Sequence, residues 1–137
     1  MDLRIYCCGI LFPYYSIGIT NESGSTFAVY AIAVCRKDPS GSEDKWNVIR
    51  RYSDFRDFHF AIIQKFPHLS QLQFPGKKTF NNLSPQFLEK RTGQLCNYLQ
   101  ILTNPDTLVN SPGLKTALLQ FLEPKVYEKG RKPLAKK

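Results

Sequence analysis

Residues 50–55, Arg-Arg-Tyr-Ser-Asp-Phe, separate two parts of the chain that differ in their hydrophobic periodicity. Before them, runs rich in Val, Ile and aromatic residues alternate with turns rich in Gly, Ser and Pro, which is typical of β-strands. We predict strands over residues 14–20, 26–35 and 45–52, and their short links favour an antiparallel meander. After residue 55 the apolar residues recur at helical spacing, so the chain is predicted to be α+β.

The helices are delimited by prolines and by residues that cap helix ends. The first is predicted to begin after an N-cap at Ser53 and to end at Pro67, the second runs from Ser84 to Asn104, and the third begins at Ser111. Their apolar stripes are Phe55, Phe58, Ile62 and Phe66; Leu88, Leu95, Leu99 and Leu102; and Leu114, Leu118 and Phe121. The predicted fold is a three-stranded antiparallel meander packed against a helical subdomain of three to four helices, with a proline-containing loop.

The positive charge of the chain is concentrated rather than spread evenly. The 137 residues carry a net charge of +8, and residues 45–91 contain nine Lys or Arg against three Asp or Glu. The tail 124–137 contains six against one. This distribution indicates an anionic partner, for which a membrane surface, a nucleic acid and an acidic protein are the candidates.

The cysteines and histidines do not indicate a metal or catalytic site. Cys7 and Cys8 are adjacent, Cys35 and Cys96 stand alone, and neither histidine accompanies a recognisable nucleophile motif. We therefore expect a non-enzyme with no metal and no cofactor. No cleavable signal peptide is recognisable, and free thiols in a reducing cytosol are expected. Acylation of Cys7 or Cys8 is the alternative to idle thiols.

Three groups of residues suggest a pocket for an anion. Arg51 and Tyr52 lie where a strand ends and a helix starts, and a guanidinium can hold a phosphate through two parallel hydrogen bonds. Arg91 falls between Leu88 and Leu95 on the core-facing stripe of its helix, where a charge needs a salt bridge, an exit to solvent or an external anion. Lys77 and Lys78 follow a Pro-Gly turn, and taken alone they are loop lysines in solvent.

The order of these groups resembles the phox homology (PX) domain, a phosphoinositide-binding module. The resemblance covers roughly residues 14–123 and rests on three motifs: Arg50-Arg51-Tyr52-Ser53-Asp54-Phe55, Phe74-Pro75-Gly76-Lys77, and Glu89-Lys90-Arg91-Thr92-Gly93-Gln94-Leu95. The stretches Gly76–Asn82 and Phe87–Arg91 look like the sorting nexins that also carry a regulator-of-G-protein-signalling domain. On this basis we expect an N-terminal extension at 1–13, a PX domain at 14–123 and a basic linker at 124–137.

The resemblance implies a role for each site residue. Arg51 would hold the 3-phosphate of the inositol ring, Tyr52 would pack against the ring, Lys77 would meet the phosphate that joins the ring to glycerol, and Arg91 would bind the far hydroxyls. Further basic contacts are expected from Arg50, Lys78 and Lys90, and membrane insertion from Phe80 and Leu83. Strand alternation alone does not decide between Arg50 and Arg51, because both faces of that strand carry apolar residues.

The expected function is membrane targeting through a phosphoinositide, most simply phosphatidylinositol 3-phosphate, in endosomal trafficking or membrane tethering. The expected partners are that lipid and other domains of the same full-length chain, and not nucleic acid. The expected location is the cytoplasmic face of endosomal membranes, with contact sites between organelles as a further location. A PX fold that acts mainly as a protein-interaction scaffold, with weak or broad lipid binding, is the alternative.

Overall fold

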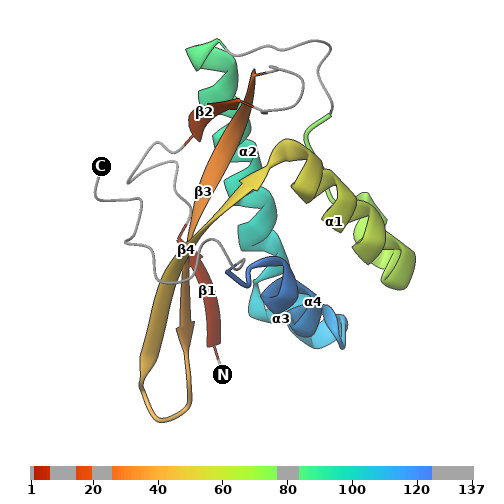
Figure 1. The fold of residues 1–137 in the computed structure, drawn as a ribbon. Helices are drawn as coiled ribbons and strands as arrows, with labels where there is room; N and C mark the ends of the chain where they lie inside the picture. The colour runs from red at the N-terminus through yellow and green to blue at the C-terminus, as the bar shows by residue number, and fades with distance from the viewer. Residues whose placement is uncertain (1, 7–14, 20–25, 77–83, 125–137) are drawn as a thin grey trace.

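An antiparallel sheet built around one long strand forms the β-part of the computed structural model (Figure 1). The structure describes residues 2–6, 15–19, 26–76 and 84–124, with side chains from residue 28 on. The strands are β1 (Asp2–Tyr6), β2 (Tyr15–Ile19), β3 (Thr26–Lys37) and β4 (Glu43–Arg51). The predicted strands at 14–20, 26–35 and 45–52 correspond to β2, β3 and β4.

The sheet has four strands rather than the three predicted. Strands β2, β3 and β4 form the expected antiparallel meander, in which Tyr30 of β3 is paired with both Tyr15 and Arg50. Strand β1 is the addition, and it pairs with β3 from Asp2 opposite Lys37 to Tyr6 opposite Ala33. Because β4 occupies one edge of β3, β1 and β2 share the other edge. Part of the segment predicted as an N-terminal extension therefore belongs to the sheet.

Four α-helices and one 3₁₀ turn complete the described fold, within the predicted range of three to four helices. They are α1 (Tyr52–Lys65), the 3₁₀ turn η1 (Pro67–Gln71), α2 (Pro85–Leu102), α3 (Pro105–Asn110) and α4 (Leu114–Phe121). None of the helices in the described ranges is both long and apolar enough to cross a bilayer.

Two helix boundaries differ from the sequence prediction. Helix α1 begins two residues earlier than expected, with Arg51 rather than Ser53 as its N-cap residue, because the Asp54 carboxylate accepts a 2.8 Å hydrogen bond from the Arg51 amide. The Asn104-Pro105 pair ends α2 and also starts α3, since the Asn104 side chain caps the amide of Asp106. A proline at the first position of a helix stops the preceding helix and suits the new one.

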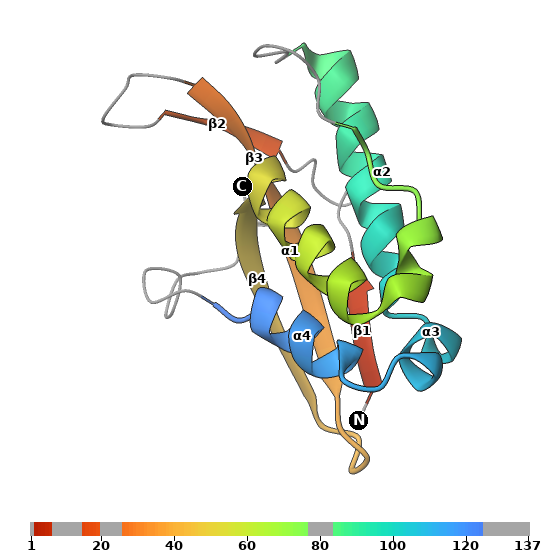
Figure 2. The same ribbon diagram turned by 90° about the vertical axis from the view of Figure 1, so that its right-hand side faces the viewer.

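The helices and the sheet share one core. Figure 2 shows α1 and α4 in front of β3 and β4, with α2 to one side. Every leucine of the predicted α2 stripe is buried. The core is made of Tyr30, Ile32, Val34, Val48, Phe55, Ile62, Phe66, Leu69, Leu95, Tyr98, Leu99, Leu102, Leu114, Leu118 and Leu122.

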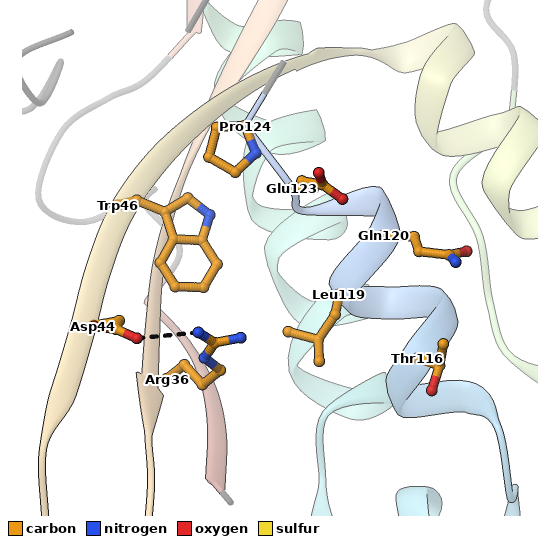
Figure 3. Close-up of a pocket in the computed structure, with 8 residues that line it drawn as sticks. All are labelled: Arg36, Asp44, Trp46, Thr116, Leu119, Gln120, Glu123 and Pro124. Carbon is orange, nitrogen blue, oxygen red and sulfur yellow. Dashed lines mark hydrogen bonds and ion pairs between the residues drawn. The ribbon is translucent and has the colours of Figure 1, made fainter. Parts of the chain in front are cut away.

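A cavity of about 490 Å³ lies between the β3–β4 hairpin and α4 (Figure 3). Its walls include the Arg36–Asp44 ion pair, at 3.0 Å, and the ring of Trp46. The Trp46 Nε1 donates a 2.8 Å hydrogen bond to the carbonyl of Leu122, which ties β4 to the end of α4. The lining contains none of the predicted site residues that the structure describes.

Candidate functional site

Arg51 lies at the junction between β4 and α1. Its side chain is exposed, and its backbone occupies the N-cap position in an extended conformation, with φ −87° and ψ 164°. The first amides of a helix lack partners within the helix and carry a partial positive charge, so they favour anions. Helix α1 has 14 residues, and Arg51 is the residue that immediately precedes its positive end.

Tyr52 and Arg91 are in direct contact, although 39 positions separate them in sequence. The Arg91 guanidinium carbon lies 4.0 Å from the centroid of the Tyr52 ring and 4.7 Å from the centroid of the Phe87 ring. A cation over the face of an aromatic ring is attracted by the ring quadrupole. Helix α1 and helix α2 thereby bring together two of the four residues predicted to bind the ligand.

The charge of Arg91 is buried without an ionic partner among the described residues. Only 7% of its surface is exposed, as the position on the apolar stripe predicted. Its Nη2 donates a hydrogen bond to the carbonyl of Gly76, and none of the ion pairs in the described chain includes it. Its Nε is buried and lacks a hydrogen-bond partner within the described ranges. Burying an incompletely satisfied cation is costly, and no salt bridge among the described residues compensates the charge of Arg91.

The field of Arg91 extends to two tyrosines. Burial raises the pKa of Tyr30 to about 12, and the positive charge of Arg91 opposes this rise. Burial also raises the pKa of Tyr52, against the opposing charges of Arg91 and Arg56. Both phenols therefore remain neutral hydrogen-bond donors at neutral pH and do not offer Arg91 a negative charge.

Arg50 points away from this site. It is 3% exposed, and its guanidinium donates hydrogen bonds to the carbonyls of Phe121 at 3.0 Å, Glu123 at 2.8 Å and Ile49 at 2.7 Å. The first two carbonyls belong to the end of α4, where a cation complements the helix dipole. The sequence prediction of a lipid contact for Arg50 is therefore corrected, since the side chain is committed to the backbone of α4.

Of the other predicted site residues, only Lys90 lies in the described part of the chain. Lys77, Lys78, Phe80 and Leu83 lie outside the described residues. Lys90 is exposed on α2, next to Arg91.

The backbone carbonyls of Pro75 and Gly76 hold the site together, a role that the sequence did not predict. The Tyr52 hydroxyl donates a 2.7 Å hydrogen bond to the carbonyl of Pro75, and the carbonyl of Gly76 accepts from Arg91. The ring of Phe74 lies 5.7 Å from that of Tyr52. The Phe-Pro-Gly motif predicts a turn, but the side chains of a motif do not show which backbone carbonyls accept hydrogen bonds.

Comparison with known proteins identifies a matching family model and related chains. The family model described as "PX domain" matches residues 38–125, more than half of the chain. Human sorting nexin-13 is 48% identical over 126 residues, which cover 91% of this chain and 13% of that protein. Human sorting nexin-25 is 33% identical over 109 residues, covering 77% of this chain and 12% of that protein. The chain therefore spans only a small part of these relatives.

A solved structure supports the same assignment. The X-ray structure of a designed CISK-PX domain has a TM-score of 0.56 and 28% identity, and covers 90% of this chain and 99% of that chain. The predicted likeness to sorting nexins that also carry a regulator-of-G-protein-signalling domain is confirmed by the match to sorting nexin-13. The PX domain of sorting nexins is a non-enzymatic module. This chain belongs to the PX domain family.

Proposed function

We propose that the chain targets its full-length protein to membranes by binding a phosphoinositide, with phosphatidylinositol 3-phosphate as the preferred lipid. Membership of the PX family implies phosphoinositide-dependent membrane targeting. The observation that carries the proposal is the stack of Arg91 on Tyr52, in which a buried guanidinium lacks an acidic partner among the described residues. A phosphorylated inositol ring supplies the missing hydrogen-bond acceptors and an anionic charge.

The roles within the pocket are assigned as the resemblance to PX domains implies, and the chemistry of each residue type supports them. Arg51, exposed at the positive end of α1, is assigned to the ring phosphate because a bidentate guanidinium matches a phosphate. Tyr52 and Arg91 are assigned to the inositol ring and its hydroxyls. Lys77, which directly follows the carbonyl of Gly76, is assigned to the phosphate that joins the ring to glycerol.

Binding proceeds in two stages. The concentration of Lys and Arg between residues 45 and 91 attracts the domain to an anionic leaflet, and the pocket then selects the head group. Lys78 and Lys90 belong to the first stage in this scheme, while Phe80 and Leu83 insert into the outer part of the bilayer. The expected location is the cytoplasmic face of endosomes, including their contact sites with other organelles, and the other domains of the full-length chain are its covalent partners.

The test is co-sedimentation with vesicles of neutral lipid, with and without phosphatidylinositol 3-phosphate. The Arg51→Ala variant should lose the phosphoinositide-dependent fraction. Lys65→Ala is the matched control, because Lys65 is exposed at the other end of the same helix. Equal binding of Arg51→Ala and the unmodified chain would falsify the assignment.

The same experiment separates this function from the protein-scaffold alternative and addresses lipid preference. A scaffold predicts equal sedimentation with and without the phosphoinositide. Vesicles that carry a 4- or 5-phosphorylated lipid at equal total charge test the assigned preference. Stronger binding to one of them than to the 3-phosphate lipid would overturn it.

A further inference from the structure

Residues 74–76, here termed the strap, lie against α1 and α2, and the side chain of Phe74 contacts both helices. The Phe74 ring stacks on the imidazole of His59 in α1, with centroids 4.6 Å apart and an interplanar angle of 5°. It also meets the edge of the Tyr98 ring of α2 at 5.0 Å and 74°. The strap is therefore clamped between two helices.

The carbonyl groups of the strap orient the proposed lipid site. Pro75 accepts the hydrogen bond of the Tyr52 hydroxyl, and Gly76 accepts that of the Arg91 guanidinium. A shift of the strap would release both donors together. Whatever holds Phe74 in place thus also controls the geometry of the stack between Tyr52 and Arg91.

His59 is the α1 residue on which the Phe74 ring stacks. It is 7% exposed, and its Nδ1 lies 2.8 Å from the hydroxyl of Tyr98. In the neutral tautomer that carries its proton on Nε2, Nδ1 accepts the hydrogen bond of this phenol. Burial raises the pKa of Tyr98, so the hydroxyl stays protonated and available as the donor.

The surroundings of His59 favour its neutral form. Tyr98 is the titratable group that faces it from α2, the strap contributes only the ring of Phe74, and Phe60 is the aromatic neighbour on α1. No ion pair of the described residues includes His59, and burial lowers the pKa of its imidazole. A protonated His59 would have no carboxylate ion-pair partner among the described residues.

We infer that His59 is a positioning residue for the lipid pocket, and that protonation of His59 loosens the strap and weakens phosphoinositide binding. The inference deepens the proposed function and rests on it. A free imidazole titrates near pH 6.5, and the native state disfavours the charged form. The contribution of His59 to the strap is therefore complete above about pH 6.5 and is lost as the pH falls through the lowered native value.

The test uses vesicles with phosphatidylinositol 3-phosphate between pH 7.5 and 5.5, the unmodified chain, and the variants His59→Gln and His68→Gln. His68 is the only other histidine of the chain and lies exposed on η1, which makes it the matched control. A phosphomonoester also titrates near pH 6. That effect is common to all three proteins, so the difference between their pH profiles reports on the histidines.

His59→Gln should bind about fivefold more weakly at pH 7.5, the loss expected for one hydrogen bond, and should fall less steeply with acid than the unmodified chain. His68→Gln should keep the unmodified profile. Coinciding profiles for His59→Gln and the unmodified chain would overturn the inference.

A lipid-free measurement keeps the inference testable if His59→Gln does not fold or if vesicles do not bind. The NMR signal of the Arg91 Nε–H group, followed against pH in the unmodified chain, should shift with the same midpoint as the His59 ring signals. If the Arg91 signal does not shift, or shifts with a different midpoint, protonation of His59 is not coupled to the position of Arg91. Coupled signals together with no phosphoinositide-dependent sedimentation at pH 7.5 would instead refute the proposed function and leave the positioning role of His59 standing.

Discussion

The guanidinium of Arg91 lies over the ring of Tyr52, 4.0 Å from its centroid, and this stack joins the start of α1 to the second turn of α2. The same guanidinium touches the ring of Phe87 and the carbonyl of Gly76. A charge is thus enclosed by aromatic faces and one backbone acceptor. Such an arrangement favours ligand binding over stability, because a buried charge without full compensation reduces the free energy of unfolding.

Replacing Arg91 by Met should separate these two contributions. Arg91→Met keeps apolar contact with the rings of Tyr52 and Phe87 and removes the charge. We expect an unfolding free energy equal to that of the unmodified chain or up to about 2 kcal/mol higher, together with loss of phosphoinositide binding. The unfolding free energy is measured by urea unfolding followed through the fluorescence of Trp46, the single tryptophan. Phosphoinositide binding is measured by vesicle sedimentation.

Lys90→Met is the control for that substitution, because Lys90 is the exposed neighbour on the same helix and loses the same charge. It should leave the unfolding free energy within about 0.5 kcal/mol of the unmodified chain. A strongly destabilised Arg91→Met that still binds lipid would show that the charge serves the fold rather than the ligand.

The neighbouring arginines Arg50 and Arg51 should have opposite phenotypes. Arg50→Ala removes three hydrogen bonds to backbone carbonyls, two of them at the end of α4, and should cost about 3 kcal/mol of stability. Below its unfolding temperature the variant should still bind phosphoinositide. Thermal unfolding followed by circular dichroism measures the loss of stability, and vesicle sedimentation well below the unfolding midpoint measures lipid binding.

Arg51→Ala should instead lose about tenfold or more in phosphoinositide affinity, with an unfolding free energy within about 0.5 kcal/mol of the unmodified chain. The reason is that its side chain is exposed, whereas its capping contact uses the backbone amide, which alanine retains. If Arg50→Ala lost binding while Arg51→Ala lost stability, the assignment of the two residues would be reversed.

Substitutions at Tyr52 should distinguish its hydroxyl from its ring. Tyr52→Phe removes the hydrogen bond to the carbonyl of Pro75 and keeps the surface on which Arg91 stacks. It should cost about 1 kcal/mol of stability and reduce lipid affinity about fivefold. Tyr52→Leu removes the ring as well and should bind more weakly still. Equal binding by the two variants, measured by isothermal titration with a soluble head group, would rule out a role for the ring.

The pairing of β1 with β3 also has a measurable consequence. Removing residues 1–6 leaves the β3 backbone from Ala33 to Lys37 without its partner on that edge. The midpoint of thermal unfolding should fall by several degrees, about 3 °C or more, and amide hydrogen exchange should speed up in this part of β3. Exchange in the half of β3 that pairs with β2, Thr26–Tyr30, serves as the internal control. Unchanged exchange at residues 33–37 would contradict the pairing.

Much of this fold could be predicted from local periodicity. The β-branched run 26–35 became β3, and the leucines of α2 lie in the core as their spacing required. Pro67 and Pro85 mark helix boundaries because proline lacks an amide proton and restricts the residue before it. The inward position of Arg91 also followed from helical spacing alone, since it depends only on residues three and four positions away.

The remaining features depend on contacts between residues far apart in sequence. Alternation along β4 placed Arg50 and Arg51 on opposite faces but did not say which face met α4, because both faces carry apolar residues. The face that carries Arg50 meets α4 because Arg50 donates hydrogen bonds to the carbonyls of Phe121 and Glu123. These residues are 71 and 73 positions away from Arg50 in sequence. The strand β1 was missed for a similar reason, as its stability comes from pairing with β3.

The sequence by itself determined the order of β2, β3, β4, α1, α2 and α4, the concentration of positive charge and the presence of an arginine on a helical apolar face. Only the tertiary structure decided that Arg91 meets Tyr52 and that the strap between Phe74 and Gly76 orients both. The physical reason is that helix and strand periodicity are local properties of the backbone. Aromatic stacking and hydrogen bonds to backbone carbonyls form between segments that only the folded chain brings together.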